Sequence, residues 1–228
     1  MTSDDHKTPM LEPDDFVIVR KRKKYRFAQF ANTRNCYELV QWQKLDKKSS
    51  EIVLEVGAGT GLFLVELATL HPEKTYIALD VKADRLQKGG REAESRGLNN
   101  IFFVRSRADQ LLQVVSAGSV QELWLTFSDP FPKKSDAKRR LTAPNFLEIY
   151  KKALVFKNAE LYMKTDSHAL FDWSLEQFAA HNWQIQQLTN DLHESNLEDE
   201  YKIMTTYEKK WTQQNLPIYF VSVAPNHR

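Results

Sequence analysis

Residues Glu51 to Asp80 read EIVLEVGAGTGLFLVELATLHPEKTYIALD, and this stretch decides the fold. It begins with a short apolar run rich in β-branched residues, Ile52 to Val56, which is typical of a buried parallel strand. Three glycines then permit a tight turn, and the residues that follow have helical spacing until His71-Pro72 stops the helix. A second strand, Thr75 to Leu79, ends at Asp80. The pattern is strand, glycine loop, helix, strand and acid.

This order is typical of the nucleotide-binding half of a doubly wound α/β sheet, where an acid about 20 positions after the glycines accepts hydrogen bonds from a ribose. The glycines, Gly57, Gly59 and Gly61, have the spacing GxGxG rather than the GxGxxG of a dinucleotide site. Glu55 just before them would repel a pyrophosphate, but it suits the ammonium and sulfonium charges of S-adenosylmethionine. We therefore favour a methyltransferase-type site, with Asp80 at the ribose, over a nicotinamide site or a purely structural turn.

The composition limits the class of protein. A length of 228 residues suits one α/β domain, and the formal net charge of +2 hides local blocks of both signs. The single cysteine, Cys36, excludes an intramolecular disulfide, and we interpret it as a buried apolar residue rather than a nucleophile. The first residues lack the layout of a signal peptide, and no apolar run has the length of a membrane span. We expect a cytoplasmic protein.

The N-terminal part is strongly basic. Residues 1 to about 15 resemble a loose polar tail, and between Phe16 and Arg34 there are seven basic residues and no acid. With its interleaved aromatic residues this segment is typical of a phosphate-binding arm, although a solvated charge run near a terminus has the same composition. We treat residues 1–34 as a basic, partly flexible N-terminal arm and residues 35–228 as the methyltransferase domain.

A second basic segment lies beside the expected active site. The strand Glu122 to Phe127 ends in the loop Ser128-Asp129-Pro130-Phe131-Pro132, and open α/β sheets bind their ligands at this edge. Between Lys133 and Arg140 five basic residues accompany one acid. A solvated helix face does not explain why this run follows a proline-flanked aspartate at a strand end. We therefore favour a nucleic-acid substrate.

The remaining chain continues the alternation of helices and strands. We expect helices over Cys36 to Leu45, Val81 to Arg96, Ala108 to Ala117, Pro144 to Leu154 and Phe171 to His181. We expect further strands over Ile101 to Val104, Ala159 to Lys164, Trp183 to Leu188 and Leu216 to Val223. The expected fold is a Rossmann-like α/β fold, a mostly parallel twisted sheet with helices on both faces.

Several segments together resemble the bacterial tRNA (guanine-N7)-methyltransferases of the TrmB type. They are the glycine loop with its leading Glu55, the segment DPFPKK followed by KRRL, the pair Thr165-Asp166 and the segment TTYE from Thr205 to Glu208. The resemblance runs from roughly Tyr25 to Ser222. It implies an S-adenosylmethionine-dependent enzyme that methylates N7 of the variable-loop guanine at position 46 of tRNA. It also implies a Rossmann-like sheet whose last strand is antiparallel to the others.

The resemblance implies roles for individual residues as well. S-adenosylmethionine would be contacted around the glycine loop and the strand ends, by Glu55, Gly57, Gly59, Gly61, Asp80, Arg107 and Asp129. Asp129 would also be the catalytic residue. The substrate would be contacted by Lys133, Asp166, Thr205, Thr206, Tyr207 and Glu208. The RNA would be contacted by the run Ser135, Asp136, Ala137, Lys138, Arg139 and Arg140.

Two positions depart from the family pattern. Arg107 stands where family members usually carry an aspartate that faces the adenine, and Asp109 follows two residues later. This departure leaves the adenine contact open. Phe131 replaces the tryptophan of the usual DPWPKK, so an aromatic ring is kept and we expect the packing of the loop to survive.

Methylation of guanine N7 needs no general base, because N7 has a lone pair that is not protonated at neutral pH. Catalysis depends on aligning N7 with the sulfonium methyl group and on stabilising the positive charge that moves onto the purine. Asp129 could stabilise this charge, or Asp129 or Asp166 could accept hydrogen bonds from the guanine edge. The sequence leaves both assignments open.

Other interpretations of the same residues remain. Asp166 could cap a helix, and T-x-x-E at Thr205 to Glu208 matches a capping box, which can coexist with a substrate role. An adenine-N6 methyltransferase would carry [DNS]PP[YF], whose paired prolines are absent from Ser128 to Phe131. A catalytically silent RNA-binding module on the same fold is favoured by Arg107 alone. We expect tRNA as the partner, with no metal and no membrane, and both a monomer and a homodimer fit the sequence.

Overall fold

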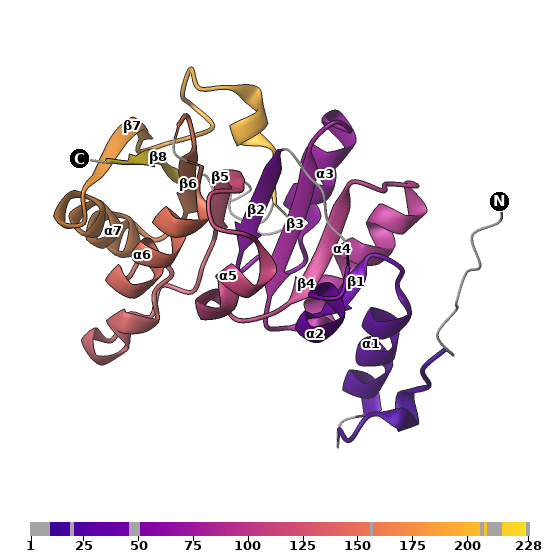
Figure 1. Cartoon of the computed structure of the whole chain (residues 1–228). Helices are drawn as coiled ribbons and strands as arrows, with labels where there is room; N and C mark the ends of the chain where they lie inside the picture. Colours follow the sequence, from indigo (N-terminus) through magenta and orange to yellow (C-terminus); the bar gives the residue numbers. More distant parts are fainter. Residues whose placement is uncertain are drawn as a thin grey trace.

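The computed structural model describes residues 10–18, 21–45, 51–155, 157–205, 208 and 216–226. These residues form an eight-stranded sheet in the order β1-β4-β3-β2-β5-β6-β8-β7 (Figure 1). The strands are β1 (Cys36–Glu38), β2 (Ile52–Val56), β3 (Thr75–Asp80), β4 (Ile101–Arg105), β5 (Val120–Thr126), β6 (Glu160–Thr165), β7 (Trp183–Thr189) and β8 (Tyr219–Pro225). Neighbours among the first six strands pair in parallel, whereas β8 is antiparallel to both β6 and β7. The expected mostly parallel sheet with an antiparallel last strand is confirmed.

Helices cover both faces of this sheet. One face carries α1 (Lys21–Asn32), α3 (Leu62–Leu70) and α4 (Ala83–Ser95), and the other carries α2 (Leu39–Trp42), α5 (Leu111–Val114), α6 (Pro144–Ala153) and α7 (His168–Ala180). The side chains of the central strand β2 point to the two faces of the sheet. Val53 joins the core beneath α3, whereas Leu54 and Val56 join the core beneath α6. No helix in this described part of the chain is long and apolar enough to cross a membrane.

The segment from Cys36 to Leu45 is not one helix, so this sequence prediction is wrong. Cys36–Glu38 forms β1, which pairs with β4, and the Phe103 amide donates to the carbonyl oxygen of Asn35 at 2.8 Å. The short helix α2 occupies only Leu39–Trp42. The backbone groups along the edge of β4 need partners, and this tertiary pairing overrides the local helical pattern. Cys36 is buried as expected, and burial raises the pKa of its thiol.

Part of the basic N-terminal segment is a packed helix. In α1, at the β1 end of the molecule (Figure 1), Phe30 is buried and Phe27 packs against the same core. Arg26 Nη1 lies 3.4 Å from Asp84 Oδ2 on α4. Pro13–Asp15 form a short 3-10 helix, whereas Arg20 lies outside the described residues. The boundary at residue 34 and the flexibility of the arm stay predictions.

Helix α4 approaches the glycine loop closely because Gly89 has no side chain. A Cβ atom at this position would collide with the carbonyl oxygen of Thr60 and with the ring of Phe103. We expect Gly89→Ala to lower the free energy of unfolding by roughly 1–3 kcal/mol, even though alanine is the better helix former. Urea denaturation followed by circular dichroism measures this change.

Lys88→Ala is the matched control for Gly89→Ala, because Lys88 is exposed on the same helix. The control should change the free energy of unfolding by less than about 0.5 kcal/mol. A Gly89→Ala protein as stable as this control would contradict the close packing of α4 on the loop.

Candidate active site

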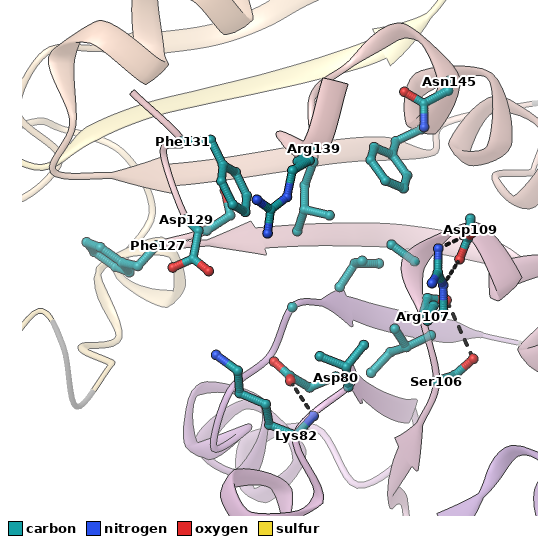
Figure 2. A pocket seen from close by; sticks show the side chains of 18 of the residues that line it. Asp80, Lys82, Ser106, Arg107, Asp109, Phe127, Asp129, Phe131, Arg139 and Asn145 are labelled. Atoms are coloured by element: carbon teal, nitrogen blue, oxygen red, sulfur yellow. Dashed lines mark hydrogen bonds and ion pairs between the residues drawn. The ribbon is translucent and has the colours of Figure 1, made fainter. Parts of the chain in front are cut away.

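A pocket of about 650 Å³ lies at the carboxyl ends of the central strands. Its wall includes Val56 at the end of β2 and Gly57 after it, Asp80 at the end of β3, Ser106 after β4 and Asp129 after β5. Strands β3 and β5 flank β2 on opposite sides, so the pocket lies where the order of strands reverses. Figure 2 shows Asp129, Phe131 and Arg139 along one side of the pocket and Asp80 and Lys82 along the other.

The glycine loop has the left-handed conformation that the sequence predicts. The φ angles are 77° for Gly57, 57° for Gly59 and 65° for Gly61. The amides of Gly57 and Ala58 donate to the carbonyl oxygen of Leu79 at 2.8 and 3.0 Å, which fixes the loop to β3. Of the three glycines, Gly57 lines the pocket.

Asp80 connects the loop to the pocket. Its Oδ2 accepts from the Gly59 amide and its Oδ1 from the Lys82 amide, both at 2.8 Å. Only 8% of the residue is exposed. Each carboxylate oxygen keeps a second lone pair, so the side chain can still accept hydrogen bonds from a ribose. The backbone thus orients Asp80 before any ligand binds.

Glu55 does not lie in the pocket wall. Its side chain is fully buried on the α3 side of the sheet, where it makes a hydrogen bond with the Thr126 hydroxyl. Burial raises the pKa of Glu55 to about 8, an effect that the Thr126 hydrogen bond and the nearby Lys164 offset in part. Its Oε2 has no hydrogen-bond partner among the described residues.

Two features fit S-adenosylmethionine. Glu55 Oε2, which has no partner among the described residues, can accept a hydrogen bond from an ammonium group. Glu55 directly precedes Val56, which lines the pocket. A Cβ on Gly57 would lie 3.0 Å from Leu141 Cδ1, so a side chain at this position would narrow the pocket that both residues line. In the part of the chain that the structure describes, no group of three or more His, Cys, Asp or Glu residues could hold a metal ion.

Asp129 is the exposed carboxylate of the pocket on the β5 side. The run that follows contains the 3-10 helix η3 (Lys134–Arg139), and four of its five basic side chains are exposed: Lys133, Lys134, Lys138 and Arg139. In the same run, Ser135 is exposed and Asp136 and Ala137 are half-buried. Lys138 and Arg139 also line the pocket. A cationic surface therefore continues directly from Asp129.

Arg140 differs from the other basic residues of this run. It is 9% exposed, and its Nε and Nη2 donate to the carbonyl oxygens of Pro130 and Phe131, each at 3.0 Å. Its guanidinium carbon lies 4.5 Å from the centroid of the Trp173 ring. The structure thus gives Arg140 an internal role in holding the loop, and the RNA contact expected for it stays a prediction.

Arg107 lines the pocket together with Asp109. Its Nε and Nη2 donate to the two carboxylate oxygens of Asp109 at 2.9 and 2.8 Å (Figure 2). This hydrogen-bonded pairing lowers the pKa of Asp109. The part of the pocket wall that follows β4 therefore contains an ionised carboxylate. It lies two residues after the position where family members usually carry an aspartate. Sequence reasoning did not place Asp109 in the site, although its spacing from Arg107 was visible.

Two of the remaining predicted residues, Thr205 and Glu208, belong to a buried cluster on the α3 side. The Glu208 amide donates to Thr205 Oγ1 at 3.0 Å and the Thr205 amide to Glu208 Oε2 at 2.7 Å, which confirms the capping box. Glu208 is fully buried, and its Oε1 lies 3.6 Å from Lys164 Nζ and 3.2 Å from His193 Nε2. Thr206 and Tyr207 lie outside the described residues.

Lys164 is the buried cation of this cluster. Its Nζ donates to the carbonyl oxygen of Ile203 at 3.0 Å and lies 4.7 Å from the centroid of the Phe63 ring. Burial lowers the pKa of Lys164 to about 8, and Glu208 and Glu55 offset part of that effect. Sequence reasoning did not single out this lysine. The sequence feature that could have identified it is a charged residue directly after the apolar run Leu161 to Met163, since a charge in a buried strand needs partners.

The structure thus brings some of the predicted residues together and separates others. Gly57, Asp80, Arg107, Asp129, Lys138 and Arg139 share one pocket. Glu55, Lys133, Asp166 and Glu208 are not among its lining residues. The alternative that Asp166 caps the helix is wrong, because Ser167 makes this bond: its Oγ accepts from the Leu170 amide at 3.3 Å.

The buried Glu55 predicts a pH-dependent stability. Because its pKa is raised in the folded protein, the folded state keeps a proton that the unfolded chain loses. Raising the pH from the unfolded value near 4.5 to about 8 should therefore lower the free energy of unfolding. Glu55→Gln has no such proton, so the wild type should lose stability relative to this variant as the pH rises through that range.

Urea denaturation of the ligand-free protein between pH 5 and pH 8 measures this difference. Glu148→Gln is the control, because Glu148 is an exposed carboxylate on α6, and its curve should run parallel to that of the wild type. Parallel curves for Glu55→Gln as well would show that Glu55 is ionised in the folded protein across this range.

Comparisons with known proteins place the chain among methyltransferases. A family model described as "Putative methyltransferase" matches residues 49–221. The tRNA (guanine-N(7)-)-methyltransferase of Brevibacillus brevis is 37% identical over 183 residues, covering 80% of this chain and 85% of that protein. The enzyme of the same name from Cytophaga hutchinsonii is 37% identical over 184 residues, covering 79% and 83%.

Solved structures share the fold. The 16S rRNA methyltransferase KamB gives a TM-score of 0.60 at 17% identity, covering 82% of this chain and 94% of that chain. A SAM dependent methyltransferase from Aquifex aeolicus gives a TM-score of 0.54 at 15% identity, covering 77% and 82%. These likenesses confirm the methyltransferase-type sheet.

Proposed function

The chain belongs to the family of tRNA (guanine-N(7)-)-methyltransferases, and from this premise we propose that it transfers a methyl group from S-adenosylmethionine to N7 of a guanine in tRNA. The guanine is the one at position 46, in the variable loop. The observation that carries the proposal is the arrangement of Asp80 and Asp129 in one pocket at the reversal of strand order. Asp80 accepts a hydrogen bond from the glycine loop. Asp129 is exposed, and the exposed basic residues of the cationic surface follow it in the chain.

The cofactor side of the pocket is organised by β2, β3 and β4. When bound, S-adenosylmethionine supplies a methyl group on a positively charged sulfur. Asp80 accepts hydrogen bonds from the ribose, with its orientation already set by two backbone amides. Glu55 accepts from the ammonium group through its unsatisfied oxygen. Asp109, held by Arg107, provides an acceptor on the adenine side.

Asp129 acts where the charge develops. N7 attacks through a lone pair, so no side chain needs to remove a proton, and the purine gains a positive charge in the transfer. A carboxylate beside the purine stabilises that charge by electrostatic attraction. Asp129 is therefore the catalytic residue, and alignment of the two reactants supplies the rest of the acceleration.

The RNA side is the cationic surface after Asp129. Lys133, Lys134, Lys138 and Arg139 are exposed, which suits contacts to backbone phosphates. Such contacts position the tRNA without reading its sequence. Asp166 and the segment from Thr205 to Glu208 complete the substrate site in this proposal, and the protein acts in the cytoplasm.

A silent RNA-binding module is less well supported than the enzyme. Arg107 was the feature that favoured it, because a cation replaces the usual acid at the adenine side. The neighbouring Asp109 puts a carboxylate in the same wall of the pocket, so the acceptor is not lost.

Product analysis tests the proposed function. Purified protein is incubated with labelled S-adenosylmethionine and unmodified bulk tRNA, and the digested nucleosides are identified. We expect 7-methylguanosine from the wild type. Asp129→Asn should slow its formation by at least roughly 100-fold, because the variant loses the charge that faces the developing cation.

Asp199→Asn is the control, because Asp199 is an exposed carboxylate outside the pocket, and this variant should match the wild type. Circular dichroism should show that both variants are folded. A different methylated nucleoside, or full activity of Asp129→Asn, would contradict the proposal.

A further inference from the structure

The loop after β5 holds two aromatic residues in a rare backbone conformation. Phe127 has a φ angle of 48° and Phe131 one of 41°, a left-handed region that bulky residues seldom occupy. Asp129 lies between them in the sequence, and all three line the pocket. Strain of this kind persists only where the surrounding structure enforces it, and it concentrates at functional sites.

Arg140 enforces the conformation at Phe131. Its guanidinium donates to the carbonyl oxygens of Pro130 and Phe131 and is itself fixed on the ring of Trp173. A buried cation with such partners has little freedom to move. The backbone conformation at Phe131 is therefore set by the protein before any ligand is present.

The aromatic rings of the pocket have different surroundings. Phe127 packs against the core beneath α3, and Phe146 packs against the core beneath α6, with its ring 6.4 Å from that of Tyr150. Phe131 belongs to neither core among the described residues. It lines the pocket wall two residues after Asp129.

The face of the Phe131 ring is covered by Arg139. The guanidinium carbon of Arg139 lies 4.3 Å from the ring centroid, and Figure 2 shows this side chain against the ring and above Asp129. The Arg139 side chain is 59% exposed, and its ion pair with Asp136 is long, at 3.5 Å. Contacts between exposed charged groups of this kind are weak and exchange readily. A planar group that binds more tightly can replace the guanidinium.

We propose that the Phe131 ring is the surface on which the target guanine stacks, a base subsite that Arg139 covers until RNA binds. The inference rests on the proposed function. A guanine on this ring lies beside Asp129 and faces the cofactor side of the pocket across it. The released Arg139 then adds one more cation to the surface that contacts the phosphates.

The chemistry of the transfer favours an aromatic surface here. Guanine N7 forms a bond to the methyl carbon while the carbon–sulfur bond breaks, and the electron pair of that bond stays on sulfur as a neutral thioether. No proton moves, and the purine takes up the positive charge. A phenyl face attracts a planar cation more strongly than a neutral base. Phe131 therefore stabilises the methylated purine, and the transition state that leads to it, more than the unmethylated guanine.

Phe131→Leu tests the proposal, because it keeps apolar bulk and removes the aromatic face. With saturating tRNA and S-adenosylmethionine, we expect single-turnover methyl transfer to slow roughly 10- to 100-fold, the effect of losing one base–aromatic stack. Phe131→Tyr keeps the ring and should restore most of the rate. In the presence of S-adenosylhomocysteine, the wild type should bind tRNA that contains 7-methylguanosine more tightly than unmodified tRNA, and Phe131→Leu should lose this preference.

Phe102→Leu is the matched control. Phe102 is a half-buried ring that packs against the core beneath α6 and does not line the pocket, so this variant should leave the ratio of the two affinities intact. An unchanged rate and an unchanged ratio in Phe131→Leu would overturn the stacking surface while the proposed function stands. Absence of 7-methylguanosine from the wild-type reaction would overturn the proposed function itself.

Discussion

The carboxylate of Asp80 is the constraint on which the site depends. It accepts one backbone amide from the glycine loop and one from the start of the next segment, at Gly59 and Lys82, both at 2.8 Å. These bonds join the turn after β2 to the end of β3. The left-handed conformation of three glycines makes this turn tight enough for the Gly59 amide to reach the Asp80 carboxylate. Together with the Leu79 carbonyl, which holds Gly57 and Ala58, Asp80 therefore sets the position of the loop and of its own side chain, for which we propose the ribose contact.

A second constraint acts from the opposite side of the pocket. Arg140 holds the loop after β5 through two carbonyl oxygens, and this loop presents Asp129 and Phe131. Beneath the sheet, the buried Lys164 lies between the strand ends and the segment that contains Glu208. Buried charges of this kind are costly unless they are fully paired, and here each has several polar partners. The site thus combines a rigid frame with an exposed cationic rim.

Much of the fold could be predicted from the sequence, because its main signals are local. The apolar run of β2, the three glycines and the acid at Asp80 carry their structural meaning within thirty residues, and the structure agrees with each. The edge strand β1 could not be found in this way. It has only three residues, and its pairing with β4 depends on a neighbour more than sixty positions away.

Contacts between distant parts of the chain also decide what the sequence left open in the site. In the run KRRL the residues Arg139 and Arg140 have equal propensities, yet one is exposed and the other is buried on Trp173, a residue of a different helix. Glu55 was expected to contact the cofactor, and this contact stays a prediction, because the alternation of β2 places its buried side chain on the α3 side rather than in the pocket wall. Calorimetric titration of S-adenosylhomocysteine tests the central claim most directly. We expect one-to-one binding to the wild type and to the control Asp172→Asn, whose aspartate is exposed, and binding at least roughly tenfold weaker to a folded Asp80→Asn. Equal affinity for Asp80→Asn would contradict it.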